Sequence, residues 1–579
     1  MFNKIFKWNA RLVSTRPKLI LLVAFIVTII AGFFATNLSM ELSWVSMAPS
    51  DSPAVKEYEE ILDNFPSLDS ILILVESNNY DRLVEASRET AAAIAGLYEY
   101  VTSVVAGIET DFMLENALML MDEEEAKLMG YAFYDANLTS VYQLLYMIVD
   151  ETAEKAAEGT LTDEQIIYSA SAVKGIESVI EQSNMALDGD IDRNELTSSM
   201  ERIFVGDGIL TSPDGKMAMI TVQPGFDMMD EVNLIPGVNA IESEIKDIND
   251  QYADVTIRGT GMHFVARDEM VSIMNDSYLA TILSIVLIIL LLYFAFRTWL
   301  APLFTVTPLI FGIIWAMGIV GLVIGRLNMF TVFAVAMLAG LGIDYSIHLF
   351  SSYTERRAAK IKKKKAMAYA ICRTGPSIIV GALTTATAFF ALNISNLKIL
   401  SELGTVMGTG IVTTLVAVFW VLPAIITLKK EKKKNIRKIS GNYRIIGRIA
   451  YGIHKVKYFI LAVVLIGAGF MGYMATQVGF DMNLMNLEPK GLESIELMEH
   501  MVDKYDTSST NLSVQADSLD EVFNLHKELE GIDGVAEVTS IVSVLPPMED
   551  QKRSLDTAEE INDLLKDKVG EYPVDRIAL

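Results

Sequence analysis

The sequence predicts a polytopic α-helical membrane protein with about seven spans and a large α/β domain outside the cytoplasm. First, the chain of 579 residues is 51% hydrophobic with a mean hydropathy of +0.35, which is too apolar for an ordinary soluble protein. Second, several apolar runs are long enough to cross a hydrocarbon core about 30 Å thick. Third, the charge is unevenly distributed. Residues 37–276 contain 46 acidic and 12 basic residues, so the remainder carries +8 although the whole chain carries −26.

The first predicted span, Leu19 to Thr36, follows five basic residues with no acidic residue among the first eighteen positions. A cleaved signal peptide is the alternative, but no small-residue cleavage site follows the run cleanly. We therefore expect a retained span. The later predicted spans are Leu279–Phe296, Thr305–Ile324, Met329–Phe350, Ser377–Leu392, Leu403–Leu428 and Phe459–Ala475.

The basic residues between the spans predict the orientation. Residues 351–374 contain eight basic residues and one acid, and residues 428–457 contain eleven and one. Cytoplasmic loops carry such an excess, so both segments and the N-terminus are expected inside the cell. Lys362 to Lys365 are expected to contact membrane lipids of the anionic inner leaflet. The predicted location is the cell membrane (the inner, cytoplasmic membrane), with residues 37–276 extracytoplasmic.

Six regions follow from this pattern. They are a basic N-terminus with the first span (1–36), an extracytoplasmic domain (37–276), a five-span bundle (277–428), a cytoplasmic basic linker (429–458), the seventh span (459–476) and a second external segment (477–579).

The extracytoplasmic domain alternates strand-like and helix-like patterns, as an α/β domain does. The expected order is two β-α-β-type units with a mainly helical insertion from Thr110 to about Glu201. The expected elements are strands at 70–75, 101–108, 216–222 and 254–258, helices at 81–98 and 232–252, and a turn at Pro213-Asp214-Gly215.

Several function classes have no support in the sequence. The acidic excess argues against a nucleic-acid partner, because phosphate binding needs clustered basic residues. Cys372 is the single cysteine, so it cannot form an intrachain disulfide and has no companion ligands for a metal. The patterns HExxH and GxSxG and a P-loop are missing from the sequence. We expect neither an enzyme nor a bound metal or cofactor.

The chain contains a long-range repeat. The segment from Phe480 to Asp506, which follows a basic stretch and an apolar span, repeats the pattern from Leu38 to Phe65 after the first span. The repeat continues with a strand-like segment at 511–516, a helix-like one at 519–529 and a strand-like one at 535–542. A full second copy would need roughly three hundred further residues and five more spans. We expect a fragment or an interrupted reading frame, or else a shortened protein that pairs with another chain.

Asp344 is the one acidic residue near the middle of a predicted span. An ionised carboxylate in hydrocarbon costs roughly 2.5–3.5 kcal/mol on insertion scales, so we expect it to face a protein interior or a water path and to gain and lose a proton. Gly340 and Gly342 precede it and predict close helix packing. Tyr345 adjoins it, and His348 follows one turn later on the same face, so these residues could form a proton relay.

Other polar residues are open to two interpretations. His348 lies near the cytoplasmic end of its span and could simply contact water or headgroups. Thr384 and Thr385 could line the same proton path, but threonines often bond back to their own helix. Glu402, at the external start of the sixth span, is expected to be solvated.

The stretch G-x-x-x-D-Y-x-x-H from Gly340 to His348 resembles the resistance-nodulation-division (RND) superfamily, and most closely its MMPL group and hydrophobe exporters. The sterol-sensing-domain proteins of the Patched and Niemann-Pick type are more distant. PSIIVGALTTATAFFAL from Pro376 and LGTVMGTGIVTTLVAVFWVLPAI from Leu403 are similar to stretches of the fifth and sixth spans of the family. The likeness covers one complete half and the start of a second.

The resemblance implies a transporter driven by the proton-motive force, with an RND-type internal repeat and a ferredoxin-like porter domain. It implies export of lipids or other hydrophobic molecules, with Asp344 and Tyr345 carrying protons. The possible partners are a lipid or hydrophobic cargo, protons, membrane lipids, and a second copy or a complementary second-half chain. The alternatives are a lipid-sensing or scaffolding membrane protein without flux, and a SecDF-like auxiliary of protein export.

Overall fold

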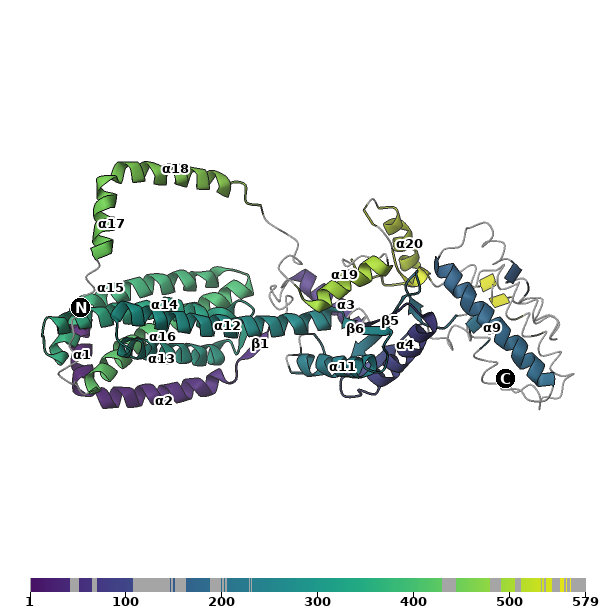
Figure 1. Ribbon diagram of the computed structural model, residues 1–579, viewed down its shortest axis with the longest axis horizontal. Helices are drawn as coiled ribbons and strands as arrows, with labels where there is room; N and C mark the ends of the chain where they lie inside the picture. Colours follow the sequence, from purple (N-terminus) through teal and green to yellow (C-terminus); the bar gives the residue numbers. More distant parts are fainter. Residues whose placement is uncertain are drawn as a thin grey trace. The chain divides into compact units, whose positions relative to one another are not determined.

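The computed structural model describes the spans and the centre of the α/β domain (Figure 1). It divides into two compact units. The first contains residues 1–59, 228–231 and 266–492, and the second contains residues 60–227, 232–265 and 493–579. The described residues are 2–41, 52–64, 70–107, 163–187, 206–228, 230, 232–429, 444–479, 491–505 and 512–532, with short pieces and single residues elsewhere. Most of the expected helical insertion at 110–201 lies outside them, apart from α9 (Asp163–Leu187).

The seven-span prediction is confirmed, since seven helices in the described part are long and apolar enough to cross a membrane. Most are longer than the apolar runs, because polar turns continue the helix at one end. They are α2 (Pro17–Ala35), α12 (Met262–Phe296), α13 (Leu300–Val323), α14 (Ala334–Ala358), α15 (Lys363–Ala391), α16 (Lys398–Leu428) and α18 (Lys457–Ala475). Short 3₁₀ turns precede α14 (Thr331–Phe333) and follow α15 (Leu392–Ile394).

The core of the first unit is built around α16, which packs against α13, α15, α14 and α2 (Figure 1). Small residues allow the closest approaches. A Cβ added at Gly312 of α13 would lie 2.4 Å from the Cα of Thr414 on α16, so only glycine fits there. By contrast, α18 buries none of its residues. It is preceded by the basic helix α17 (Arg444–Lys455).

The N-terminus forms a helix, which was not expected from its basic residues. In α1 (Phe2–Thr15), the side chains of Phe6, Ala10 and Val13 are buried. They recur at helical spacing, and the helix contacts α15 and α16, with the ring of Phe6 6.1 Å from that of Phe419. The basic segment at 362–365 begins α15 rather than lying apart, because Ala366, Met367 and later apolar residues continue a buried face.

A two-stranded parallel sheet joins the ends of two spans. β1 (Ser39–Glu41), just after α2, pairs with β7 (Arg326–Asn328), just after α13, with Met40 opposite Leu327. At Gly325 the backbone has a φ of +79°, which favours glycine and turns the chain from α13 into β7.

The second unit contains an antiparallel sheet in the order β3-β5-β2-β6, and β4 pairs with β5. Along the chain the order is β2, α4, β3, α9, β4, β5, α11, β6, which is β-α-β-β-α-β once α9 and the two-residue strand β4 are set aside. The bounds are β2 (Ile71–Ser77), α4 (Tyr80–Ala95), β3 (Val101–Val105), β4 (Leu210–Thr211), β5 (Met217–Pro224), α11 (Leu234–Asn249) and β6 (Val255–Thr260). The side chain of Asn79 caps α4 by accepting from two backbone N–H groups, as short polar residues do at helix starts.

Helix α19 (Glu493–Tyr505) packs on this sheet although it follows the seventh span. Its Leu497 is buried with Leu74 and Met217. Thr260 of β6 donates to the backbone carbonyl of Ser494 at 2.6 Å. The helix equivalent to α19 in the first repeat, α3 (Pro53–Asn64), also follows a span.

The remainder of the second repeat agrees with the prediction only in part. Helix α20 (Leu519–Glu530) forms where a helix was expected, and a 3₁₀ turn covers Ile541–Ser543. The described residues at 512–516 form no strand. A strand needs a hydrogen-bonded neighbour, and none is provided for this segment among the described residues.

Candidate functional site

Helix α14 carries the Asp-Tyr motif on two different faces. Tyr345, Ser346 and Leu349 are buried, whereas Asp344 and His348 are exposed at the side of the bundle. Successive residues of a helix point about 100° apart, so neighbours in the sequence separate in this way. The structure therefore does not bring Asp344 and Tyr345 together on one face.

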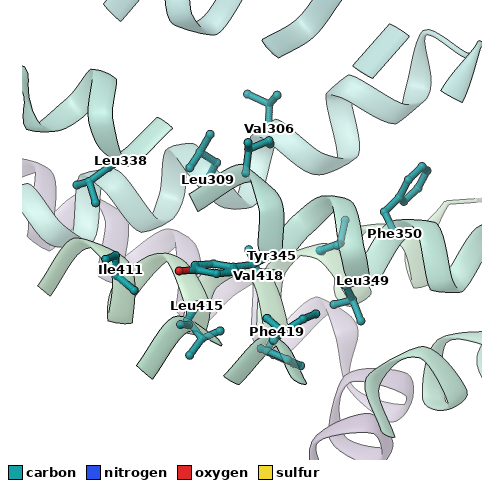
Figure 2. Packing of buried hydrophobic residues seen from close by; sticks show 14 of the residues in the cluster. Val306, Leu309, Leu338, Tyr345, Leu349, Phe350, Ile411, Leu415, Val418 and Phe419 are labelled. Atoms are coloured by element: carbon teal, nitrogen blue, oxygen red, sulfur yellow. The ribbon is translucent and has the colours of Figure 1, made fainter. Parts of the chain in front are cut away.

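Tyr345 lies inside the apolar core of the bundle and is 9% exposed. Figure 2 shows its ring among residues of α16, with Ile411, Leu415 and Val418 around it. The ring thus fills space between α14 and α16.

Asp344 belongs to an exposed stripe of α14 together with Gly340 and His348, spaced four residues apart. Among the described residues no hydrogen bond or ion pair involves the Asp344 side chain. Gly340 also borders open space, since a Cβ added there would meet nothing within 4 Å. This stripe lies on a surface that no described helix of the chain covers.

Gly342 lies on the opposite, packed side of α14. A Cβ added at this position would lie 2.7 Å from Cγ2 of Thr414 and 2.8 Å from Cδ1 of Leu309. The absence of a side chain therefore lets α14 approach α13 and α16.

Two threonines of α15 make hydrogen bonds within their own helix. The hydroxyls of Thr384 and Thr385 both donate to the carbonyl oxygen of Gly381, at 2.8 and 3.0 Å. This is the local bonding that competes with a place in a proton path.

Two buried hydroxyls face the inside of the bundle. Ser346 and Thr414 are fully buried, and neither hydroxyl has a hydrogen-bond partner among the described residues. An unpaired buried hydroxyl costs free energy, so these two polar atoms stand out in an apolar core. Thr414 was not predicted as a site residue, because an uncharged threonine in an apolar span does not stand out in the sequence.

A polar cluster holds the spans together beside the small sheet. The Arg326 guanidinium donates to Oε1 of Glu402 at 3.0 and 3.2 Å, and the Asn328 side-chain amide donates to Oε2 at 2.9 Å. The Glu402 side chain is 13% exposed. The expectation that Glu402 is solvated was wrong, because β7 supplies donors for both carboxylate oxygens.

Comparison with known proteins assigns the family. Residues 122–449 match the model of the MMPL family, and the chain belongs to this family. It is 26% identical over 449 residues to the membrane protein MJ1562 of Methanocaldococcus jannaschii. The aligned region covers 74% of this chain and 95% of that protein.

More distant similarity extends to larger proteins. The chain is 23% identical over 308 residues to the hopanoid transporter HpnN of Burkholderia multivorans, covering 53% of this chain and 35% of that protein. For HpnN of Rhodopseudomonas palustris the values are 23% over 354 residues, 60% and 40%. The chain thus spans well under half of the hopanoid transporters it matches.

Proposed function

We propose that this chain is the transporting unit, or part of one, of an RND-type exporter that moves lipids or other hydrophobic molecules out of the cytoplasmic membrane. The family assignment and the similarity to hopanoid transporters support hydrophobic cargo. The chain's own chemistry is transport rather than catalysis in this proposal. The α/β domain would be the extracytoplasmic porter domain.

The proton-motive force is the proposed energy source, and Asp344 is the observation that carries this proposal. An ionised carboxylate in a membrane span costs roughly 2.5–3.5 kcal/mol on insertion scales, and Asp344 has no ion-pair partner among the described residues. It can hold a negative charge only when water or a partner reaches it. Its charge state therefore depends on which environment the stripe faces, and this is what a proton-coupled carrier requires.

His348 and Gly340 extend this proposed site. His348 lies one turn nearer the basic loop and would pass protons between Asp344 and the cytoplasm. Gly340 leaves space for a neighbouring helix against the stripe. The covering helix would come from a second copy or from a complementary second half.

The experiment that tests the proposal is efflux of a fluorescent lipid analogue from proteoliposomes under an imposed pH gradient. Asp344→Asn is expected to abolish the gradient-dependent part of the flux, because the amide cannot take up a proton. Asp276→Asn is the matched control, since it makes the same change at an exposed position on α12 before the apolar run. Equal flux in Asp344→Asn and the unmodified chain would refute proton coupling through this residue.

The same experiment separates the other classes. A lipid-sensing or scaffolding protein binds the analogue without gradient-dependent flux. A protein-export auxiliary would crosslink to translocating chains, and it would show no dependence of lipid flux on Asp344.

A further inference from the structure

A groove lies on the side of the bundle away from the Asp-Tyr motif, between α2, α13 and α16. Its volume is about 310 Å³, and Val27, Ile30, Trp315, Ile319 and Val416 are among its lining residues. This is at the lower end of the roughly 300–1,000 Å³ typical of ligand pockets.

Small residues create the floor of the groove. A Cβ added at Gly318 of α13 would lie 2.5 Å from the Cα of Ala31 on α2, so the two helices touch there. At Gly321 it would lie 2.3 Å from the carbonyl oxygen of Phe34. The larger side chains of α2 and α13 lie on either side of these close contacts and form the walls of the groove.

The polar groups along the groove are already bonded within the protein. The indole N–H of Trp315 donates to the hydroxyl of Thr28 at 2.8 Å, and that hydroxyl donates to the carbonyl of Ala24. The hydroxyl of Thr413 donates to the carbonyl of Gly312 at 2.9 Å. The side-chain donors along the groove are therefore already used within the protein, and an apolar cavity of this kind does not hold water.

The rim is open to the surroundings of the spans. Ile30 is 53% exposed, and Leu322, another lining residue, is 60% exposed. Both lie within membrane-spanning helices, so the medium at the opening is lipid hydrocarbon. An empty groove would forfeit dispersion contacts along its walls, which a flexible apolar chain restores.

We propose that this groove binds the acyl chain of a membrane lipid that enters sideways from the bilayer. The fit is to a hydrocarbon chain without polar groups, whereas a headgroup would find no partner here. The inference depends on the membrane setting of the spans and does not depend on proton coupling, so either can fail without the other.

Trp315 provides a direct probe, because it lines the groove while only 7% of its surface is exposed. The chain has five tryptophans, and a variant that keeps Trp315 with phenylalanine at the other four reports on this position alone. In vesicles of phosphatidylcholine with brominated acyl chains, bromine quenches an indole only at close contact. A variant that keeps only Trp299, which is 73% exposed, gives the reference for free access to lipid.

The expected result is strong quenching of Trp315 that falls at least two-fold when Val416→Phe fills the groove. Val380→Phe is the matched control, since Val380 is an exposed valine on α15 outside the groove. Ile319→Phe repeats the test from α13 if the first variant does not fold. No quenching of Trp315, or quenching unchanged by both filling variants, would overturn the proposal.

Two further arms identify other occupants. If unbrominated cholesterol relieves the quenching of Trp315 more than that of Trp299, the ligand is a fused-ring lipid and the acyl-chain assignment fails. If quenching appears only on dilution of the protein in the vesicles, another copy fills the groove, and the assignment fails as well.

Discussion

At the scale of single residues, the ion pair between Lys504 of α19 and Asp214 gives a pH-dependent prediction. The Lys504 ammonium donates to Oδ2 of Asp214 at 2.8 Å and lowers the pKa of that carboxyl from 3.8 to about 2, while the pKa of Lys504 rises in return. A lowered carboxyl pKa contributes stability above its unfolded value, and this contribution is lost as the pH falls toward 2.

Lys504→Met is therefore expected to weaken the docking of α19 at pH 7 by less than about 1 kcal/mol, because both side chains are about one-third exposed. Amide hydrogen exchange of α19 measures this. The difference between variant and unmodified chain should shrink as the pH falls from about 4 to 2. A difference that stays constant over this range would contradict the assigned role.

Glu402 gives a second prediction at this scale. Glu402→Gln removes the charge that two donors share, and hydrogen bonds to charged groups contribute about 1.5–3 kcal/mol. We expect a lower melting temperature in detergent. Glu355→Gln, at an exposed position of α14, should leave it unchanged. Equal melting of both variants would show that the cluster does not stabilise the spans.

The sequence identified Asp344 as a candidate site residue, but it did not predict which side chains surround it. A charged residue in an apolar run is visible in any sequence, whereas the face on which it lies depends on how α14 packs. The same limit applies to Glu402, whose donors on β7 lie more than seventy residues earlier. Long-range partners of this kind leave no local pattern.

At the scale of helices, two glycines of neighbouring spans should respond differently to alanine. Gly312→Ala places a methyl group 2.4 Å from the Thr414 backbone, so the helices must move apart, at a cost of about 1–3 kcal/mol. Gly340→Ala meets nothing within 4 Å and should be tolerated in the isolated chain. Thermal unfolding in detergent compares them. Similar melting temperatures would contradict the close contact of α13 with α16.

The contact of α19 with the sheet makes a further prediction. Leu497→Ala removes a side chain that is 2% exposed, and such truncations cost about 2–5 kcal/mol. We expect α19 to loosen on the sheet and become more sensitive to proteolysis, although polar contacts such as the Thr260–Ser494 hydrogen bond and the Lys504–Asp214 ion pair remain. Leu519→Ala, on the exposed helix α20, should not have this effect. Unchanged protection of α19 would refute the contact.

Elements with a strong local signal were predicted well. The spans follow from long apolar runs, and β2, α4, β5 and α11 follow from periodicity. Helix α1 was not predicted, because the N-terminal segment was interpreted by its positive charge and not by the apolar spacing of Phe6, Ala10 and Val13. The pair β1 and β7 was missed because three-residue strands have no period to detect.

At the scale of the whole molecule, the repeat and the exposed stripe of α14 point to the same requirement. Gly340, Asp344 and His348 lie on an uncovered face of a span, and α18 buries no residue. An apolar span such as α18 can face lipid, whereas a carboxylate in a span is stabilised by a protein interior or a water path. The proposed proton-coupled exporter would therefore need protein neighbours against this stripe.

The most direct test of proton-coupled export is to run the coupling backwards. A gradient of the fluorescent lipid analogue is imposed across proteoliposomes without a pH gradient, and a pH-sensitive dye records the lumen. If Asp344 couples lipid to proton movement, downhill movement of lipid shifts the luminal pH with the unmodified chain and with Asp276→Asn, but not with Asp344→Asn. Lipid movement without any pH change with the unmodified chain would contradict proton-coupled export.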